Sequence, residues 1–457
     1  MPRTHSLPEH IVIPVETLNR EFDGKLLLAL CAYERGFKPI IGGRTEIHRR
    51  IADLPRSIYV SKGIRIGNRV ALSLLQKLGH LIVALEEEGL VRFPDEAYFM
   101  MLDPKTFNRA SILYAWGHDN AELWRRFPKY RDTPIVEAGN PRMDMLRPEL
   151  RDFYAADVAA LHRRFGRFVL FNSNFSVVNH FIPGFQRFRV AGHAQNGKSD
   201  EIKAGIYNHK SVLFEHFKRL LPALSAALRP YNLVIRPHPS ENLQTWRDAA
   251  QSLPNVHVLY EGPVAPWLMA TSALVHNTCT SAIEAAIVGT PALSYRPVRS
   301  DEYDVPLPNL VSEEFDTAEA LCAAAREALD RNAANGTLSD ANRTILAAHI
   351  AALDGAFSSE RIIDALGSNR ARLEAWPMPG PVERLLGQVG VLTRNVRRAA
   401  TTRMTGRSSA RYTEHKFPGL DEQYVNSRIA RLSGLLGRFG GLQARRLQPD
   451  IFVIEPA

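Results

Sequence analysis

The segment ALVHNTCTSAIEAAIVGTPALSYRP, residues Ala273–Pro297, predicts a buried strand, a helix and a second buried strand. Polar residues end the first strand, and a Gly-x-Pro turn at Gly289–Pro291 separates the helix from the second strand. This order is typical of one βαβ unit in a parallel sheet. Because a helix N-terminus carries unpaired N–H groups and a positive dipole end, Thr280 and Ser281 lie where a phosphate is bound well. Glu284, one helical turn further on, can reach the hydroxyls of a ribose.

A second segment, NLVIRPHP at Asn232–Pro239, predicts another buried strand that ends in polar residues. Its two prolines fix the backbone around His238 as the strand leaves the sheet. In open α/β sheets, ligands bind outside the carboxyl ends of the strands. We therefore expect His238 and Arg236 to contact a donor phosphate and to offset the charge that develops on the leaving group. The alternative is a capped strand end with an internally bonded histidine.

Helix capping is the alternative for the hydroxyls of the first segment, because Thr or Ser followed by Glu is a common helix start. Capping and phosphate binding are compatible at one helix N-terminus. Asn277 precedes the same helix, so it is a further candidate to line the site of Thr280 and Ser281.

Strand and helix patterns alternate along most of the chain, which predicts an α/β fold with two Rossmann-like domains and a cleft between them. We expect a first domain over 1–150, a second over 151–370, and a basic C-terminal extension over 371–457 that can pack back on the first domain. The polar segment Phe188–Tyr207 is too long for an ordinary turn and predicts a mobile active-site loop. The predicted strands are His10–Val15, Phe37–Gly42, Ser57–Ser61, Leu81–Leu85, Ile112–Trp116, Pro134–Ala138, Phe168–Phe171, Leu233–Ile235, Val256–Tyr260, Ala273–His276 and Ala292–Tyr295.

Three carboxylates follow one predicted strand of the first domain, in Glu86-Glu87-Glu88-Gly89. Like charges at a sheet edge repel one another, which favours a shared proton and can make one carboxylate an acid or base. We choose Glu88, beside Gly89, as the catalytic carboxylate. A solvated acidic turn is the alternative.

Polar side chains also follow the first predicted strand of the second domain, at Asn172, Ser173 and Asn174. Their amides and hydroxyl can bind the donor or the acceptor. An Asx-turn that serves only the backbone is the alternative.

The first domain supplies further candidates at loops and strand ends. Asp144 follows Arg142 in the motif GNPRMD, and a structural Arg–Asp pair is the alternative there. Asp119 follows a predicted strand. Arg20 and Asp23 lie in the expected loop after the first strand, which makes them candidates for acceptor binding.

The net charge of +9 is unevenly placed, because the segment Arg384–Thr413 contains seven arginines and no acidic residue. Apolar residues alternate with these arginines, and a basic amphipathic stretch can bind anionic lipid. A solvated arm and a nucleic-acid-binding arm are the alternatives. No aromatic RNA-binding motif supports nucleic acid as a partner.

Several motifs and segments are missing from the sequence. Neither Gly-x-Gly-x-x-Gly nor a P-loop pattern occurs, which disfavours NAD enzymes and P-loop ATPases. Three widely spaced cysteines without a CxxC pair predict neither a disulfide framework nor a zinc site. The first ten residues lack the apolar run of a signal peptide, and no segment approaches the ~18 apolar residues of a membrane-spanning helix. We therefore expect a cytoplasmic protein.

Five motifs together resemble the bacterial surface carbohydrate biosynthesis proteins: RPHPSEN, HNTCTSAIEAAIVGTP, FNSNFS, GNPRMD and EEEG. More distantly, the chain is similar to Kdo transferases of the capsule and lipopolysaccharide type and to bacterial sialyltransferases. The resemblance covers Ile11–Pro297, and it implies the GT-B architecture of two Rossmann-like domains.

Bacterial sialyltransferases carry an acidic-Asp-Gly motif with the catalytic carboxylate, and a His-Pro and a paired-Ser motif that bind CMP. Glu87-Glu88-Gly89 matches the first motif with Glu for Asp, His238-Pro239 matches the second, and Thr280-Ser281 matches the third with Thr for Ser. Related Kdo transferases retain configuration through a second carboxylate, for which Asp144 and Asp119 are the candidates here.

The resemblance implies a glycosyltransferase that moves Kdo or another nonulosonate from a CMP-activated donor to a surface-polysaccharide or lipopolysaccharide acceptor. The CMP-sugar is the donor substrate, and no cofactor is expected. CMP is linked through a single phosphate and no DxD motif occurs, so no metal is expected. The arginine-rich stretch then suggests a peripheral position at the inner face of the bacterial inner membrane.

Three other functions remain open. A CDP-glycerol-dependent polyol-phosphate transferase also carries RPHP-like and GNPR-like motifs. A UDP-sugar epimerase also has two Rossmann-like domains and needs no acceptor. A non-enzymatic scaffold at the membrane surface needs only the arginine-rich stretch.

Overall fold

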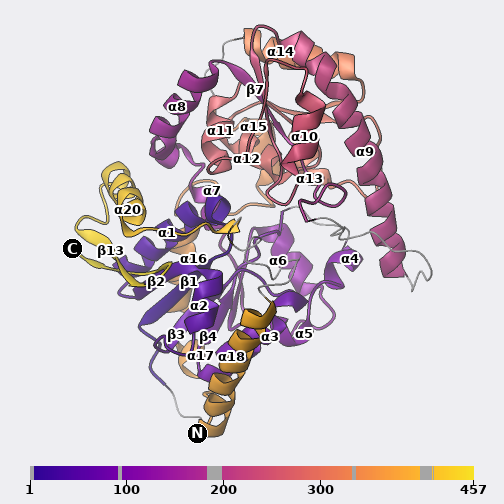
Figure 1. The fold of residues 1–457 in the computed structure, drawn as a ribbon. Helices are drawn as coiled ribbons and strands as arrows, with labels where there is room; N and C mark the ends of the chain where they lie inside the picture. The colour runs from indigo at the N-terminus through magenta and orange to yellow at the C-terminus, as the bar shows by residue number, and fades with distance from the viewer. Residues whose placement is uncertain (1–4, 91–94, 183–197, 332–335, 402–413, 415) are drawn as a thin grey trace. The chain divides into compact units, whose positions relative to one another are not determined.

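The computed structural model describes the chain except for residues 1–4, 91–94, 183–197, 332–335, 402–413 and 415 (Figure 1). The chain divides into two compact units. Unit 1 is formed by Met1–Gly89, Tyr98–Phe153 and Leu346–Ala457, and unit 2 by Leu90–Ala97 and Tyr154–Ile345. Each unit consists of a largely or wholly parallel sheet with helices on both faces, which confirms the predicted α/β class with two Rossmann-like domains.

The sheet of unit 1, within the described residues, has eight strands in the order β13-β14-β2-β1-β3-β4-β5-β6. The strands β1 to β6 are mutually parallel, whereas β14 runs antiparallel to β2 and to β13. Their bounds are β1 His10–Val15, β2 Lys38–Gly43, β3 Ser57–Ser61, β4 Leu81–Ala84, β5 Ile112–Ala115, β6 Ile135–Glu137, β13 Leu442–Gln448 and β14 Ile451–Pro456.

The sheet of unit 2 has six parallel strands, again counting the described residues, in the order β12-β11-β10-β7-β8-β9. Their bounds are β7 Phe168–Asn172, β8 Asn232–Arg236, β9 Val256–Val258, β10 Ala273–His276, β11 Ala292–Tyr295 and β12 Glu313–Phe315.

The helices connect these strands and extend the C-terminal part. They are α1 Leu18–Glu34, α2 Arg44–Arg50, η1 Ile66–Asn68, α3 Arg69–Leu78, α4 Asp95–Phe99, α5 Pro104–Phe107, α6 His118–Arg125, α7 Pro141–Asp144, η2 Pro148–Tyr154, α8 Ala155–Phe165, α9 Lys198–Leu228, α10 Leu243–Ala250, α11 Val264–Ala270, α12 Thr280–Val288, α13 Pro306–Leu310, α14 Ala318–Asp330, α15 Asp340–Leu346, α16 Ser358–Ser368, α17 Arg370–Glu374, α18 Pro381–Thr401 and α20 Glu422–Leu436.

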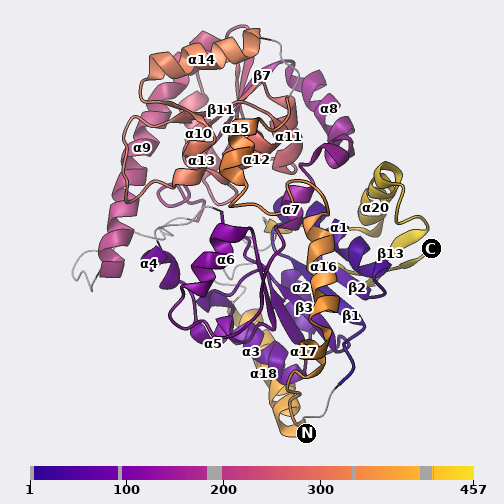
Figure 2. The same cartoon turned by 180° about the vertical axis from the view of Figure 1, so that it is seen from behind.

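Helices cover both faces of the sheet in unit 1, so its central strands are apolar along their whole length. On one face Val12 and Ile40 of the sheet pack with Leu72 of α3 and Val391 of α18. Figure 1 shows α18 in front of this sheet, and Figure 2, seen from behind, shows α16 in front. The burial of β1 on both faces explains why it is apolar from Ile11 to Val15.

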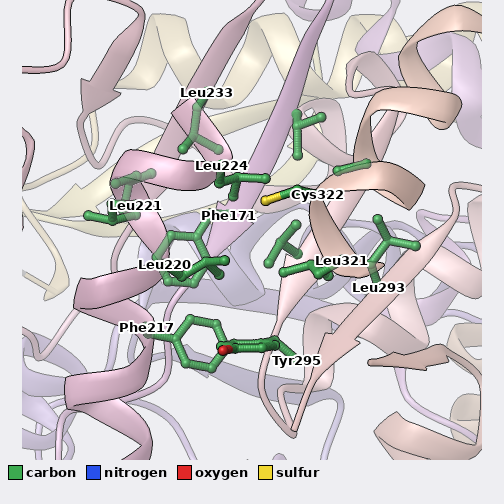
Figure 3. Packing of buried hydrophobic residues seen from close by; sticks show 14 of the residues in the cluster. Phe171, Phe217, Leu220, Leu221, Leu224, Leu233, Leu293, Tyr295, Leu321 and Cys322 are labelled. Atoms are coloured by element: carbon green, nitrogen blue, oxygen red, sulfur yellow. The ribbon is translucent and has the colours of Figure 1, made fainter. Parts of the chain in front are cut away.

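The core of unit 2 is rich in aromatic side chains (Figure 3). The ring of Phe217, on α9, stacks on Phe171 of β7 with 5.2 Å between the centroids. It also meets Tyr295 of β11 edge-on, again at 5.2 Å. These contacts attach α9 to the centre of the sheet, and Leu321 and Cys322 of α14 complete the same core.

Each sheet has one point at which the strand order reverses. In unit 1 the chain moves from β1 to β2 on one side and to β3 on the other. In unit 2 it moves from β7 to β8 and β9 on one side, then returns to β10 beside β7. At such a switch point the connections leave in opposite directions, and the space beyond the carboxyl ends of the two strands is the usual ligand site of this fold class.

The C-terminal part joins the first sheet. Phe452 and Ile454 of β14 are buried, and β14 pairs with β2 through Ile451↔Gly42 and its neighbours. Only glycine fits at position 42, because a Cβ there would lie 2.1 Å from the carbonyl oxygen of Asp450.

The polar segment predicted to be a loop is partly helical, which makes that prediction wrong for Lys198–Tyr207. The helix α9 begins at Lys198, and its buried Ile206 continues the apolar face of Leu213 and Phe217. Residues 188–197 of the predicted loop lie outside the described residues. The short strand β12 was not predicted, since Glu313–Phe315 carries no apolar run.

None of the described helices is long and apolar enough to cross a membrane.

Candidate functional site

The switch point of unit 2 brings together three polar loops that the sequence singled out. They follow β7, β8 and β10, which are neighbours in the sheet. The loops after β7 and β10 touch directly, since Asn174 Nδ2 donates to the carbonyl oxygen of Thr278 at 3.5 Å. The helix α12 begins at Thr280, immediately after the β10 loop. This edge of the sheet therefore combines polar side chains with a helix N-terminus.

The buried carboxylate of Glu241 connects two of these loops with α10. Ser173 Oγ and the Phe175 N–H donate to it at 2.8 and 2.9 Å, from the loop after β7. The His238 N–H donates at 3.2 Å from the loop after β8, and Trp246 Nε1 donates at 2.8 Å from α10. Burial raises the pKa of Glu241, against the effect of the N–H and O–H donors. The sequence analysis did not select Glu241, because its partners Ser173 and Phe175 are 68 and 66 residues away.

The ring of His238 is oriented by the backbone. Its Nδ1 accepts from the Ser240 N–H at 3.1 Å, so the proton of the neutral ring lies on Nε2. The main chain of His238 is held by Glu241. In a neutral His238 the direction of Nε2–H is thus set by two contacts within one tight loop.

Buried polar atoms without a partner gather around the switch point. Both amide atoms of Asn277 lack a hydrogen-bond partner among the described residues, although the side chain is 1% exposed. The same is true of Ser281 Oγ, Asn172 Oδ1 and Arg236 Nε in buried residues. Buried polar atoms are almost always hydrogen-bonded in folded proteins. Donors without a protein partner at a helix N-terminus are suited to bind an anionic ligand.

Side-chain capping does not occupy the start of α12. The N-cap residue is Cys279, and it makes no side-chain capping bond. Neither Thr280 nor Ser281 is therefore the N-cap residue that the alternative required, although the Cys279 thiol interacts with the side chain and the N–H of Ser281. Thr280 is half-buried at the first position of the helix, and Glu284 is buried one turn further on.

Arg236 is a buried cation at the end of β8. Its guanidinium lies over the ring of Tyr260 at 4.7 Å and donates to the carbonyl oxygen of Glu261 at 3.4 Å and to that of Gly262. Burial lowers the pKa of Arg236 from its usual value. Arg236 thus fixes the loop after β9, while its Nε has no described partner.

In unit 1 each of the three carboxylates after β4 pairs with a cation. Glu87 is buried and lies 3.2 Å from Lys25 Nζ. Glu86 is buried and lies 3.4 Å from Arg65 Nη2. Glu88 is half-exposed and lies 3.0 Å from Arg65 Nη1. The repulsion expected from the sequence is thus offset by Lys25 and Arg65, and Glu88 is the most accessible of the three.

Lys25, which the sequence analysis did not select, organises the carboxyl edge of the first sheet. It is buried within α1 and binds Glu21 at 2.7 Å as well as Glu87. Glu16, directly after β1, pairs with Arg44 at 3.2 Å. Burial alone would raise the pKa of Glu16, but Lys62, Lys416 and Arg44 lower it below its ordinary value. The switch point between β1 and β3 is therefore a dense charge network.

Two predicted arginines lie near this network. Arg20 Nη2 donates to the carbonyl oxygen of Glu87 at 3.4 Å, and Arg20 Nη1 lies 4.0 Å from Glu88. The structure thus brings together an acceptor candidate and the catalytic candidate of unit 1. Arg142 lies over the ring of Trp116 at 5.4 Å.

The carboxylate of Asp144 caps the N-terminus of α16. It accepts from the backbone N–H groups of Ser358 and Ser359 at 2.7 and 2.9 Å, and from Ser359 Oγ at 2.8 Å. Burial raises the pKa of Asp144 to about 6, against these donors. The geometry is that of a helix cap supplied from α7.

The remaining acidic candidates also have basic neighbours in unit 1. Asp119, in the first turn of α6, lies 3.5 Å from His349 Nδ1. Asp23 lies within α1 rather than in a loop, is buried, and is 3.8 Å from Arg428 Nε of α20. Arg20 also lies within α1, because this helix begins at Leu18, so the loop predicted for both residues is wrong.

No cluster of three or more His, Cys, Asp or Glu side chains suited to a metal ion occurs in the part of the chain that the structure describes.

Comparison with known proteins gave structural neighbours only. No family model matches the chain, and no curated protein matches it. The wall teichoic acid polymerase TagF aligns with 80% of this chain and 89% of its own, at 12% identity and a TM-score of 0.46. The UDP-GlcNAc 2-epimerase of Methanocaldococcus jannaschii, solved with UDP-GlcNAc and UDP, covers 79% of this chain and 99% of its own, at 13% identity and a TM-score of 0.47.

Staphylococcus aureus MnaA, solved with UDP, covers 81% of this chain and 99% of its own, at 14% identity and a TM-score of 0.48. These neighbours are distant in both sequence and structure. The function is therefore inferred from the side chains at the two switch points.

The replacement Glu241→Gln tests the interaction that connects the loops of unit 2. The amide group of Gln would face donors from Ser173, Phe175 and Trp246, so at least one buried donor loses its acceptor. We expect the free energy of unfolding to fall by about 1–3 kcal/mol, measured by chemical denaturation. The control Glu215→Gln removes an exposed charge on α9 and should leave stability unchanged. Equal stability of the two variants would contradict the assignment.

Proposed function

We propose that the chain is a glycosyltransferase that moves a sugar, Kdo or another nonulosonate, from a CMP-activated donor to a surface-polysaccharide or lipopolysaccharide acceptor. The donor phosphate binds at the N-terminus of α12. The main support is the set of buried, unpartnered polar atoms on Asn277, Ser281 and their neighbours at the switch point of unit 2. A phosphate has enough acceptor oxygens to satisfy the donors among them and the free N–H groups of the helix start.

The roles in this proposal follow from the contacts of each side chain. His238 donates from Nε2 to the phosphate as the sugar–phosphate bond breaks, because its Nδ1 is occupied by the Ser240 N–H. This contact becomes stronger as negative charge develops on CMP, so it favours the transition state. Thr280 and Ser281 bind the same phosphate, and Glu284 binds the ribose. Glu88 removes the proton from the acceptor hydroxyl, or stabilises positive charge on the sugar.

The choice of CMP rests on the sequence resemblance through His238-Pro239 and Thr280-Ser281. No metal or cofactor enters the proposal, because Arg236, His238 and the start of α12 supply the positive potential for a single phosphate. CDP-glycerol and UDP-GlcNAc remain the alternative donors. A thermal-shift or calorimetric panel of CMP, CDP-glycerol and UDP-GlcNAc decides between them, and binding of none supports the scaffold.

Peripheral membrane contact is proposed through α18. One face of this helix packs on unit 1, with Val391 buried and Asn395 Nδ2 donating to the carbonyl oxygen of Arg49 at 2.8 Å. Arg384 and Arg397 are exposed. The exposed apolar side chains of the helix are Val382, Leu385, Leu386, Val389, Leu392 and Val396.

Apolar side chains at three- and four-residue spacing, with arginines beside them, fit the interface of an anionic bilayer. A glycolipid acceptor is found at such a surface. We therefore propose that the enzyme works at the cytoplasmic face of the bacterial inner membrane.

The donor site is tested with the double variant Thr280→Ala/Ser281→Ala. Loss of two hydroxyl ligands should weaken CMP binding by roughly 10- to 100-fold in calorimetry, with the fold intact. Thr317→Ala is the matched control, because Thr317 Oγ1 caps α14 at another helix start of unit 2. It should lower stability slightly and leave CMP affinity unchanged. Unaltered affinity in the double variant would exclude this site.

The carboxylate of unit 1 is tested with Glu88→Gln, which preserves shape and removes charge. Transfer to an acceptor should fall by about 10²–10⁴-fold, because a positioned acid or base contributes that much. CMP affinity should stay as in the wild type, since the donor ligands lie in unit 2. Glu122→Gln, exposed on α6, is the control. Retained transfer in Glu88→Gln would move the role to Asp119, because Asp144 is buried and caps α16.

Membrane contact is tested with Leu385→Glu/Leu392→Glu in vesicle co-sedimentation. The wild type should bind vesicles that contain phosphatidylglycerol, and binding should fall with salt because surface charges are screened. The double variant should lose binding, while Leu310→Glu, an exposed apolar residue on α13, should retain it. Equal binding of the wild type to neutral phosphatidylcholine vesicles would rule out the electrostatic mechanism.

A further inference from the structure

Lys210 is a buried lysine that no motif in the sequence singled out. It lies on α9 four residues after Ile206 and three before Leu213, both of which are buried. Helical residues at this spacing share one face, so Lys210 is on the face that packs inward. Its side chain is 8% exposed, and lysine is rarely buried to this degree without a charged partner.

Its contacts are few. Lys210 Nζ donates to Thr278 Oγ1 at 2.9 Å. Within the described part of the chain it forms no ion pair, and an ammonium group has three hydrogens to donate. The nearby carboxylates serve other groups: Asp304 pairs with His209 at 2.8 Å and with Arg296 at 2.7 Å.

The partner of Lys210 has an unusual backbone. Thr278 has a φ of +41°, in the left-handed region that a β-branched residue rarely adopts. This conformation lies between β10 and α12, one residue after Asn277 and three before Ser281. Such outliers are retained where the surrounding structure fixes a group in place, often at ligand sites. Here the strained residue supplies the hydroxyl that contacts Lys210.

We infer that Lys210 binds the phosphate of the nucleotide donor, as the cation that complements the N-terminus of α12. The inference rests on the proposed function and adds to it the residue that balances the phosphate charge. A buried ammonium without a counterion is unfavourable, and an arriving phosphate relieves that cost. The same phosphate can accept hydrogen bonds from Asn277 Nδ2 and Ser281 Oγ, two donors without a described partner.

The charge state of Lys210 gives the inference a second readout. Burial lowers the pKa of Lys210 to about 8, and Asp304, Cys279 and Glu241 oppose this shift. His276 is the other titratable group that interacts with it, and burial, followed by the charge of Lys210, lowers the pKa of His276 to about 3. His276 therefore stays neutral at the pH values of interest.

A bound phosphate raises the pKa of Lys210 again, so CMP binding near pH 8 should take up a proton. It follows that CMP affinity should fall as the pH rises through about 8. The phosphate of CMP itself loses its second proton near pH ~6, well below this window.

The experiment is calorimetry of CMP binding from pH 7 to 9.5, in buffers of different ionisation enthalpy. Wild-type protein should take up a proton on binding near pH 8. Lys210→Met should weaken CMP roughly 10- to 100-fold and abolish the proton uptake. Lys218→Met, on the same helix but paired with Glu215 at the surface, is the control and should behave as wild type.

Proton uptake that persists in Lys210→Met, or an unchanged CMP affinity, overturns the inference. If Lys210→Met fails to fold, Lys210→Arg tests the positive charge alone. This variant should still bind CMP, but its affinity should no longer decrease above pH 8. Absence of proton uptake in the wild type also overturns it. Failure of the wild type to bind CMP, CDP-glycerol or UDP-GlcNAc instead refutes the proposed function, which keeps the two failures distinguishable.

Discussion

The buried carboxylate of Glu241 is the interaction on which the candidate donor site depends. It accepts from the loop after β7, the loop after β8 and the side chain of Trp246. Without it, several buried N–H and O–H groups would lack an acceptor, at a cost of about 1–3 kcal/mol each. By fixing the main chain of His238, it also fixes the direction in which that ring presents Nε2–H.

The sheets of both units have a switch point, but the units differ in how the charges at that point are paired. In both, parallel strands end at a switch point, and polar residues therefore collect at one edge of the sheet. In unit 1 that edge is a network of paired charges around Lys25, Glu21 and Glu87. In unit 2 it carries unpartnered donors and a cation, Lys210, without a counterion in the described chain. The charges at the edge of the sheet in unit 1 neutralise one another, whereas the edge in unit 2 is suited to an incoming anion.

The helix α18 has one face that packs in unit 1 and another that is apolar and exposed. Gly387 and Gly390 allow it to approach α3 closely, since a Cβ on Gly390 would lie 2.4 Å from the side chain of Leu74. The opposite face is left apolar and exposed. Packing of Val391 in the core of unit 1 thus leaves the remaining apolar residues of α18 exposed.

The sequence by itself determined the α/β class, most strand positions and the segments around His238 and Thr280, because apolar periodicity and strand-end polarity are local signals. It could not predict that Asp144 caps α16, or that Lys25 separates the carboxylates after β4. Glu241 and Lys210 have decisive partners 68 residues away, at Ser173 and Thr278. A buried charge on a helix or loop has no local signature. Only tertiary packing decided these contacts, because desolvation and pairing depend on which distant segments the fold places beside each residue.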